Sequence, residues 1–257
     1  NLSFQDAPGC NIEPWLSRVK SYKDQYPWLP KEHKPVYDRV DPYRFIQVLS
    51  NALDKDDVVV ADTGQARVWA QQMLNIRAQQ RFFSSVGMAP MGYGLPAAIG
   101  AAFSKEGQRV ICLSGDGGFQ LNIQELQTVI YHQLPITFFV FNNGAYGMIK
   151  QFQDLYFEGR TFGTGEGYSV PDFARVAQAY GISASTVWNN QNLKKEIETA
   201  LSYKGPFLCQ LMLSDETQVI PKVRVNCPIE DGEPLLDRDE FLSNMVVAPY
   251  EDKETAI

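Results

Sequence analysis

Two short polar runs carry the residue types best suited to chemistry in this chain of 257 residues. The first is Gly115-Asp116-Gly117-Gly118, and the second is Asn142-Asn143-Gly144. Carboxylate and amide oxygens are ligands that Mg²⁺ prefers in proteins, and glycines leave room for a phosphate to approach the backbone. Each run taken alone is typical of a plain turn. Placed as described next, the two runs together predict a site for a divalent cation that carries a diphosphate.

Each run follows a segment typical of a buried parallel strand. Val110–Ser114 and Ile136–Phe141 are short apolar runs, the second rich in β-branched and aromatic residues. Leu121–His132 lies between them with apolar residues at helical spacing, so the three segments predict a β-α-β unit. Both strands then end at the same edge of one sheet, where ligands bind in open α/β sheets. We therefore expect Asp116 and Asn143 to share one ion, beside a helix start whose N–H groups suit a phosphate.

The residues around these runs resemble a known family. The pattern resembles the signature of thiamine diphosphate enzymes, which is the motif GDG followed, after a spacer in the high twenties, by the motif NN. Here Asp116 and Asn143 are 143 − 116 = 27 residues apart. The longer stretches 115–120, 123–126 and 142–148 are similar to the acetolactate synthase branch of that family. The resemblance implies that thiamine diphosphate is held through Mg²⁺. The metal ligands would be Asp116, Asn143 and the backbone carbonyl of Ala145.

A third run extends the predicted cofactor site. Val58–Asp62 is a buried strand, and Thr63-Gly64-Gln65 stands at its carboxyl end before a helix predicted over Val68–Leu74. Strand, glycine turn and helix again place donors at the ligand edge, so Gln65 is a candidate for the diphosphate. Synthases of the family usually have His at the position of Ala66. The predicted cofactor-binding residues are Gly64, Gln65, Met91, Gly115, Asp116, Gly117, Gly118, Asn143, Ala145, Tyr146, Gly147 and Met148.

Three further residues receive catalytic roles from the resemblance. The sequence of residues 87–100 is similar to the synthase segment that lies under the aminopyrimidine and thiazolium rings of the cofactor. Met91 would be the apolar wedge that bends the cofactor, and the backbone carbonyl of Ala89 would accept from its 4′-amino group. Phe152 stands where the acetolactate synthases have a Trp that helps admit the second 2-keto acid. This difference weakens the case for 2-ketobutyrate and leaves the acceptor open.

Strand-like and helix-like segments alternate along the chain, which predicts an α/β fold with a three-layer doubly wound sheet of about six mainly parallel strands. We expect a linker or the end of a middle domain over 1–40, the cofactor domain over 41–220 and a C-terminal tail over 221–257. The remaining expected helices are 13–26, 42–53 with Asp41 as an acidic cap, 170–181 with Pro171 near its start, 192–201 and 235–242. The remaining expected strands are 81–85, 183–188 and 207–213.

Composition excludes several other classes of function. The net charge of −7 and the lack of a Lys/Arg run argue against a nucleic-acid binder. No apolar stretch approaches the roughly 20 residues of a membrane helix. The four cysteines lack metal-ligand spacing, which favours reduced thiols in a cytoplasmic protein. Asn1 is not an initiator residue, so we expect the chain to begin within a longer protein.

The resemblance implies decarboxylation of a 2-keto acid such as pyruvate, followed by carboligation to an acceptor. A glutamate from a pyrimidine-binding domain, in the same longer protein or in a second chain, would complete the site. That domain does not fit in 1–40, so we expect this chain alone to be inactive and the enzyme to be a homodimer or larger.

Three readings stay open beside this one. A 2-keto acid decarboxylase and a sugar or aldehyde carboligase share the same predicted metal site. A nucleotide-binding module is less favoured, because no G-x-G-x-x-G follows Val58–Asp62. The acceptor, a requirement for FAD and the oligomeric state are undetermined by these residues.

Overall fold

The computed structural model describes residues 11–27, 38–77, 79–104 and 107–250. The chain divides into two compact units, Asn1–His33 and Lys34–Ile257. Helix α1 (Glu13–Gln25), predicted over 13–26, is the element described in the first unit. The second unit contains the sheet and every other described element. The domain bounds predicted at residues 40 and 220 stay predictions.

A single sheet of six parallel strands forms the centre of the second unit, in the order β2-β1-β3-β4-β6-β5. The strands β3 and β4 are apolar and almost wholly buried, because helices cover both faces of a parallel sheet. The predicted doubly wound α/β fold is confirmed. The strand bounds are β1 (Val58–Ala61), β2 (Arg81–Ser84), β3 (Val110–Gly115), β4 (Ile136–Asn142), β5 (Ser183–Val187) and β6 (Phe207–Met212).

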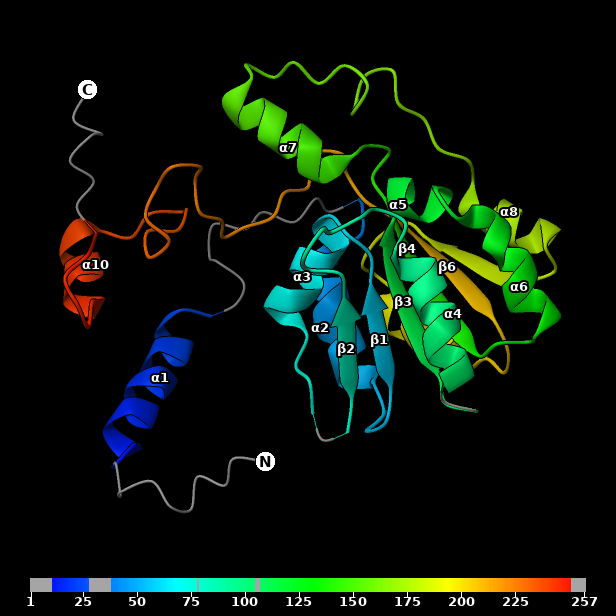
Figure 1. Cartoon of the computed structure of the whole chain (residues 1–257), viewed down its shortest axis with the longest axis horizontal. Coiled ribbons are helices and arrows are strands. Elements are labelled where there is room, and N and C mark those ends of the chain that lie inside the picture. The colour runs from blue at the N-terminus through cyan, green and yellow to red at the C-terminus, as the bar shows by residue number, and fades with distance from the viewer. Residues whose placement is uncertain (1–10, 28–37, 78, 105–106, 251–257) are drawn as a thin grey trace. The chain divides into compact units, whose positions relative to one another are not determined.

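Helices lie on both sides of the sheet (Figure 1). Alternate residues of the central strands belong to two different hydrophobic clusters, one on each face. Ile111 and Leu113 of β3 pack on α2 (Pro42–Ala52), α3 (Gln65–Met73) and α9 (Leu193–Ser202). Val110 and Cys112 pack on the second layer, which consists of α4 (Gly94–Ser104), α6 (Leu126–Tyr131) and α8 (Phe173–Ala179). None of the described helices is long and apolar enough to cross a membrane.

Aspartate side chains start two of the predicted helices. Asp41 Oδ1 accepts from the backbone N–H groups of Tyr43 and Arg44 at 2.9 and 3.2 Å, and the proline that follows suits the first turn. Asp172 Oδ1 accepts from the N–H of Arg175 at 3.1 Å, which begins α8 just after the expected proline. These caps satisfy N–H groups that a helix start otherwise leaves without partners.

The single helix predicted over 121–132 is wrong. The helical stretch begins at Asp116 as α5 (Asp116–Gln120), passes through a 3₁₀ turn, η2 (Ile123–Glu125), and resumes as α6. Asn122 lies between α5 and η2, where the helix is interrupted. Its Nδ2 donates to the carbonyl of Gly92 at 2.8 Å, a hydrogen bond to the loop before α4. A contact with a distant segment therefore breaks a helix that local spacing favours.

Three other helices, α8 among them, begin three residues away from their predicted starts. Helix α3 begins three residues earlier than expected, directly after Gly64. The short helix expected over 235–242 is α10 (Arg238–Asn244), because Asp237 caps it by accepting from the N–H of Asp239 and Glu240. Helix α7 (Gly147–Tyr156) follows the second polar run and lies beyond the carboxyl ends of the strands (Figure 1).

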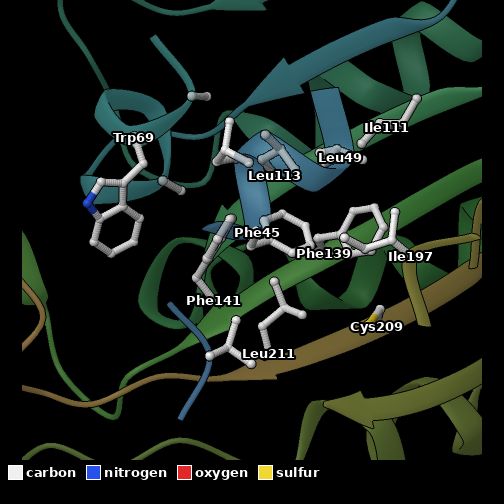
Figure 2. Packing of buried hydrophobic residues seen from close by; sticks show 14 of the residues in the cluster. Phe45, Leu49, Trp69, Ile111, Leu113, Phe139, Phe141, Ile197, Cys209 and Leu211 are labelled. Carbon is white, nitrogen blue, oxygen red and sulfur yellow. The ribbon is translucent and has the colours of Figure 1, made fainter. Parts of the chain in front are cut away.

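Aromatic side chains support the carboxyl half of β4 (Figure 2). Phe45 of α2 meets Phe139 and Phe141 edge to face, with ring centroids 5.0 and 5.3 Å apart. Trp69 of α3 packs on the same Phe141 at 5.7 Å. Such pairs contribute beyond the area they bury. This cluster therefore sets the position of the strand end from which Asn143 projects.

Phe139→Ala is expected to lower the free energy of unfolding by about 3–5 kcal/mol, because neighbouring side chains only partly refill the cavity left by a buried ring. Phe162→Ala is the matched control, since its ring is 80% exposed, and it should change this free energy by less than about 0.5 kcal/mol. Urea unfolding followed by circular dichroism measures both. A loss below about 1 kcal/mol for Phe139→Ala would contradict this account of the core.

Candidate functional site

A pocket of about 240 Å³ lies at the carboxyl ends of β1, β3 and β4. The chain leaves β1 toward β2 on one side and continues from β3 on the other, so this is the point at which ligands bind in doubly wound sheets. All twelve predicted cofactor-binding residues line it. The full lining is Thr63, Gly64, Gln65, Ala66, Trp69, Met91, Gly115, Asp116, Gly117, Gly118, Phe141, Asn143, Ala145, Tyr146, Gly147, Met148 and Ile149.

The carboxylate of Asp116 joins the two predicted polar runs. Its Oδ1 accepts from the N–H of Gly117 at 2.6 Å, and its Oδ2 accepts from the N–H of Gly144 at 2.8 Å. The register that pairs Gly115 with Phe141 places these two strand ends side by side. The structure therefore brings the carboxylate and the second run together.

Burial raises the pKa of Asp116 from 3.8 to about 6, although backbone hydrogen bonds oppose the change. The groups that act on this carboxylate are N–H donors and Tyr168, with no basic side chain among them in the described part of the chain. A buried carboxylate without an opposite charge is costly to ionise. A bound cation would offset that cost.

Asn143 stands one residue beyond β4 and faces the same pocket. Its Oδ1 accepts from the N–H of Ala145 at 3.3 Å, and its Nδ2 donates to Gln65 Oε1 at 3.2 Å. Gly144 has a φ of +63°, a left-handed conformation that glycine adopts without strain, and it turns the chain from β4 toward α7. The predicted turn therefore exists, and it presents the amide to the pocket.

Three glycines of the site are required by the packing of the protein itself. A Cβ at Gly117 would collide with the ring of Tyr146, and one at Gly118 would collide with the carboxylate of Asp62. A Cβ at Gly147 would collide with the side-chain amides of Gln65 and Asn143. The sequence predicted that glycines keep the approach open for a phosphate. The structure adds a second reason, which is the space that these neighbouring side chains occupy.

The residues given catalytic roles lie in different surroundings. Met91 lines the pocket, whereas Ala89 and Phe152 do not. Ala89 has a φ of +46°, an unusual conformation for a residue with a Cβ, and such strain gathers at functional sites. Phe152 lies on α7, where its ring packs on Tyr156 at 4.6 Å and lines a neighbouring apolar pocket.

Asp62 is a buried residue of the site that the sequence reasoning missed. Its Oδ2 accepts from Ser114 Oγ at 3.0 Å and from the N–H of Gly92 at 3.2 Å. These bonds connect β1 and β3 with the loop that carries Met91. Burial raises the pKa of the Asp62 carboxyl. An aspartate that closes an apolar strand was the signal that could have identified it.

Tyr168 was also missed. Its hydroxyl donates to Asp116 Oδ1 at 3.4 Å, and its ring packs on that of Tyr146 in a tilted arrangement with centroids 4.4 Å apart. Burial and the nearby Asp116 carboxylate raise the pKa of this hydroxyl, so it remains a donor. The residue comes from the loop after α7, 52 positions beyond Asp116, and no local pattern marks it.

Gln65 lies at the pocket as predicted, but its amide already has partners within the protein. Its Nε2 donates to the carbonyl of Thr217 at 2.9 Å and to Gln151 Oε1 at 3.4 Å. Its Oε1 accepts from Asn143. The predicted contact with a diphosphate therefore stays a prediction, and Ala66, at the position expected to hold His, is buried beside it.

The donor set suits a hard divalent cation with a polyanionic ligand. Asp116 and Asn143 offer a carboxylate and an amide oxygen, and Ala145 lines the same pocket. Within the described ranges there is no group of three or more His, Cys, Asp or Glu that could hold a metal unaided. The remaining ligands of such a cation would have to come from its own partner, as the oxygens of a diphosphate can.

Comparison with known proteins agrees with this site. The family model described as thiamine pyrophosphate enzyme, C-terminal TPP binding domain, matches residues 62–211. The acetolactate synthase large subunit of Pyropia yezoensis is 36% identical over 213 residues, which are 82% of this chain and 35% of that protein. The acetolactate synthase isozyme 2 large subunit of Escherichia coli (strain K12) is 32% identical over 213 residues, 83% of this chain and 38% of that protein.

The match covers most of this chain but only part of each relative. The probable acetolactate synthase large subunit of Methanocaldococcus jannaschii, 32% identical over 218 residues, repeats the pattern, with 82% of this chain and 36% of that protein aligned. The chain thus spans about a third of the length of the curated relatives it matches. The matched family segment begins at Asp62, directly after β1, and contains the carboxyl ends of β3 and β4 with both polar runs. The chain therefore belongs to the thiamine pyrophosphate enzymes, as an acetolactate synthase-like C-terminal TPP-binding domain.

Proposed function

We propose that this domain holds thiamine diphosphate through Mg²⁺ in a longer enzyme that decarboxylates pyruvate and transfers the resulting two-carbon unit to an acceptor. The observation that carries the proposal is the meeting of Asp116 and Asn143 at one pocket on adjacent strand ends. The relatives whose printed name is acetolactate synthase large subunit support the reaction class. A 2-keto acid decarboxylase or a sugar or aldehyde carboligase remains the alternative.

The proposed metal ligands are Asp116, Asn143 and the carbonyl of Ala145, with diphosphate oxygens completing the set. Helix α7 begins at Gly147 beside them, and the N–H groups of its first turn have no carbonyl partner within the helix. Those N–H groups and the positive end of the helix dipole favour a diphosphate there. Tyr146, Gly147 and Met148 are cofactor-binding residues on this proposal.

Two residues of the loop before α4 would act on the rings of the cofactor. Met91 lines the pocket and would hold the bound molecule in a bent shape. The carbonyl of Ala89, whose backbone is in a left-handed conformation, would accept a hydrogen bond from the 4′-amino group of the cofactor. Asp62 holds this loop through Gly92. When bound, thiamine diphosphate supplies the electron sink for loss of CO₂ from a 2-keto acid.

Further parts of the enzyme would complete the site. We infer a pyrimidine-binding domain, in the same longer protein or in a second chain, that supplies a glutamate to the cofactor ring. The chain covers 33–38% of the length of the relatives to which it was compared, which leaves length for such a domain in proteins of that kind. A homodimeric assembly and a cytoplasmic location stay predictions, and a requirement for FAD stays open.

Asp116→Asn is expected to weaken Mg²⁺-dependent binding of thiamine diphosphate by more than about 100-fold, beyond the 10–100-fold typical of outer contacts to a metal site. The substitution removes the carboxylate charge at the centre of the pocket. Glu198→Gln is the control, because it removes one charge from the exposed face of α9. Titration calorimetry measures both affinities. Equal binding by Asp116→Asn and the unaltered chain would refute the metal assignment.

The chain alone, supplied with Mg²⁺, thiamine diphosphate and pyruvate, is expected to form no acetolactate, because the glutamate that completes the cofactor site is not part of this domain. The full-length protein should form it under the same conditions. Colorimetric determination of acetoin after acidification measures the product. Steady turnover by this chain alone would show that the proposed division of the site is wrong.

Phe152→Trp in the full-length protein is expected to raise the proportion of product formed with 2-ketobutyrate over that formed with pyruvate. The larger indole would offer more apolar contact surface to the extra methyl group of 2-ketobutyrate in the apolar pocket that Phe152 lines on α7. Leu155→Trp, a change in the same pocket one turn away, is the control for bulk alone. Chromatography of products formed from equal mixtures of the two acceptors gives the ratio. No change in this ratio would remove Phe152 from the acceptor site.

A further inference from the structure

The segment 214–221, here called the strap, follows β6 and is held by side chains from three helices. Trp69 of α3 donates to the carbonyl of Gln218 at 3.4 Å. The hydroxyl of Tyr43 on α2 makes 2.6 Å hydrogen bonds with both the carbonyl and the N–H of Ile220. Gln151 of α7 binds Val219. The strap is therefore attached to the elements that surround the pocket.

The backbone of the strap determines how the side-chain amide of Gln151 is turned. The N–H of Val219 can only donate, and it does so to Gln151 Oε1 at 2.9 Å. The carbonyl of Val219 can only accept, and it receives the Nε2 of Gln151 at 3.0 Å. Gln151 is 5% exposed, so a reversed amide would bury unpaired groups. Its oxygen must face Val219 N–H and the neighbouring Gln65.

The orientation of the Gln65 side-chain amide is also determined by the hydrogen-bonding partners beside it. Its Nε2 has two hydrogens, and the two acceptors beside it are Gln151 Oε1 and the carbonyl of Thr217. Gln65 is 6% exposed, and its reversed amide would set an oxygen against both of these acceptors. Its Oε1 is thus left on the side of Asn143.

Asn143 is the last member of this chain of amides. Because Gln65 presents its Oε1 to Asn143, the Asn143 amide must turn its Nδ2 toward that oxygen. This Nδ2 donates to Gln65 Oε1 at 3.2 Å. The Asn143 oxygen is then on the opposite side of the amide, where it accepts from Ala145 N–H. A cation needs that oxygen and would be repelled by the NH₂ group. The absence of a Cβ at Gly147 leaves the space in which the amides of Gln65 and Asn143 meet.

We propose that Gln151 and Gln65 are positioning residues that transmit the polarity of the strap backbone to Asn143, so that strap docking and metal binding are coupled. The proposal rests on the function proposed above. Gln151 does not line the pocket of Asp116 and Asn143, so it acts on the metal site through Gln65. Coupling is reciprocal: whatever factor the docked strap adds to metal affinity, the metal adds to strap docking.

Gln151→Met tests the proposal, since it keeps the length of the side chain and removes both polar groups. Affinity for Mg²⁺ with inorganic pyrophosphate, measured by titration calorimetry, is expected to fall about tenfold, as for other outer contacts to metal sites. Gln72→Met is the matched control. Gln72 lies on α3 like Gln65 and donates to the strap at the carbonyl of Pro221, but it is not part of the chain of amides. The control should stay within about twofold of the unaltered chain.

Hydrogen exchange followed by mass spectrometry supplies a second readout. Mg²⁺ with pyrophosphate is expected to slow exchange of residues 217–220 about tenfold in the unaltered chain, because the N–H of Val219 reports directly on its bond to Gln151. Residues 222–233, which are paired through Lys222 and Glu233, form the comparison segment and should not change. If Gln151→Met does not fold, this measurement decides alone.

Unchanged affinity in Gln151→Met, or no ligand-dependent protection of residues 217–220, would overturn the coupling while leaving the proposed function intact. Failure of the unaltered chain to bind either pyrophosphate or thiamine diphosphate with Mg²⁺ would overturn the proposed function and the coupling with it. Weakened binding in Gln151→Met together with unaffected binding in Gln72→Met and strap protection would support it.

Discussion

The site depends on the parallel pairing of β3 and β4, which brings their carboxyl ends to one edge of the sheet. That pairing lets Asp116, at the end of one strand, accept from the backbone of Gly144, just beyond the other. The bond crosses 28 residues of sequence and closes the gap between the two polar runs. An antiparallel arrangement would place the runs at opposite edges. Everything proposed about a cation follows from this alignment.

The same pocket carries an electrostatic cost, the burial of the Asp116 carboxylate, which a bound cation would offset. Asp116 is buried, and its raised pKa shows that the ionised carboxylate is poorly solvated. Tyr168 and two backbone N–H groups orient the carboxylate without neutralising it. Functional sites commonly keep such groups in place at the expense of stability. Here the buried aromatic cluster around Phe139 and Phe141 stabilises β4, the strand that pairs with β3 beside the Asp116 carboxylate.

Polar side chains between elements give the site its shape, while the apolar core determines where the elements lie. Asp62 binds β3 and the Met91 loop, and Gln65 joins Asn143 to the strap. Buried amides with full sets of partners resist rotation, because each reversal leaves unpaired groups away from water. The positions of Asn143 and of the loop that carries Met91 are thereby maintained by hydrogen bonds to Gln65 and Asp62.

The sequence by itself determined the strands, the cap at Asp41, and the place of Asp116 and Asn143 at neighbouring strand ends. These features follow from local patterns of apolar residues and from the rule that parallel strands share an edge. Only the tertiary structure decided that the helix after Gly118 breaks at Asn122, that Tyr168 reaches Asp116, and how the amide of Gln65 is turned. Gln65 lies 78 residues from Asn143 and 152 from Thr217, and hydrogen bonds over such separations leave no periodic trace in a chain. Local spacing records which face of an element is buried, whereas the partners of a buried polar group depend on how the whole chain packs.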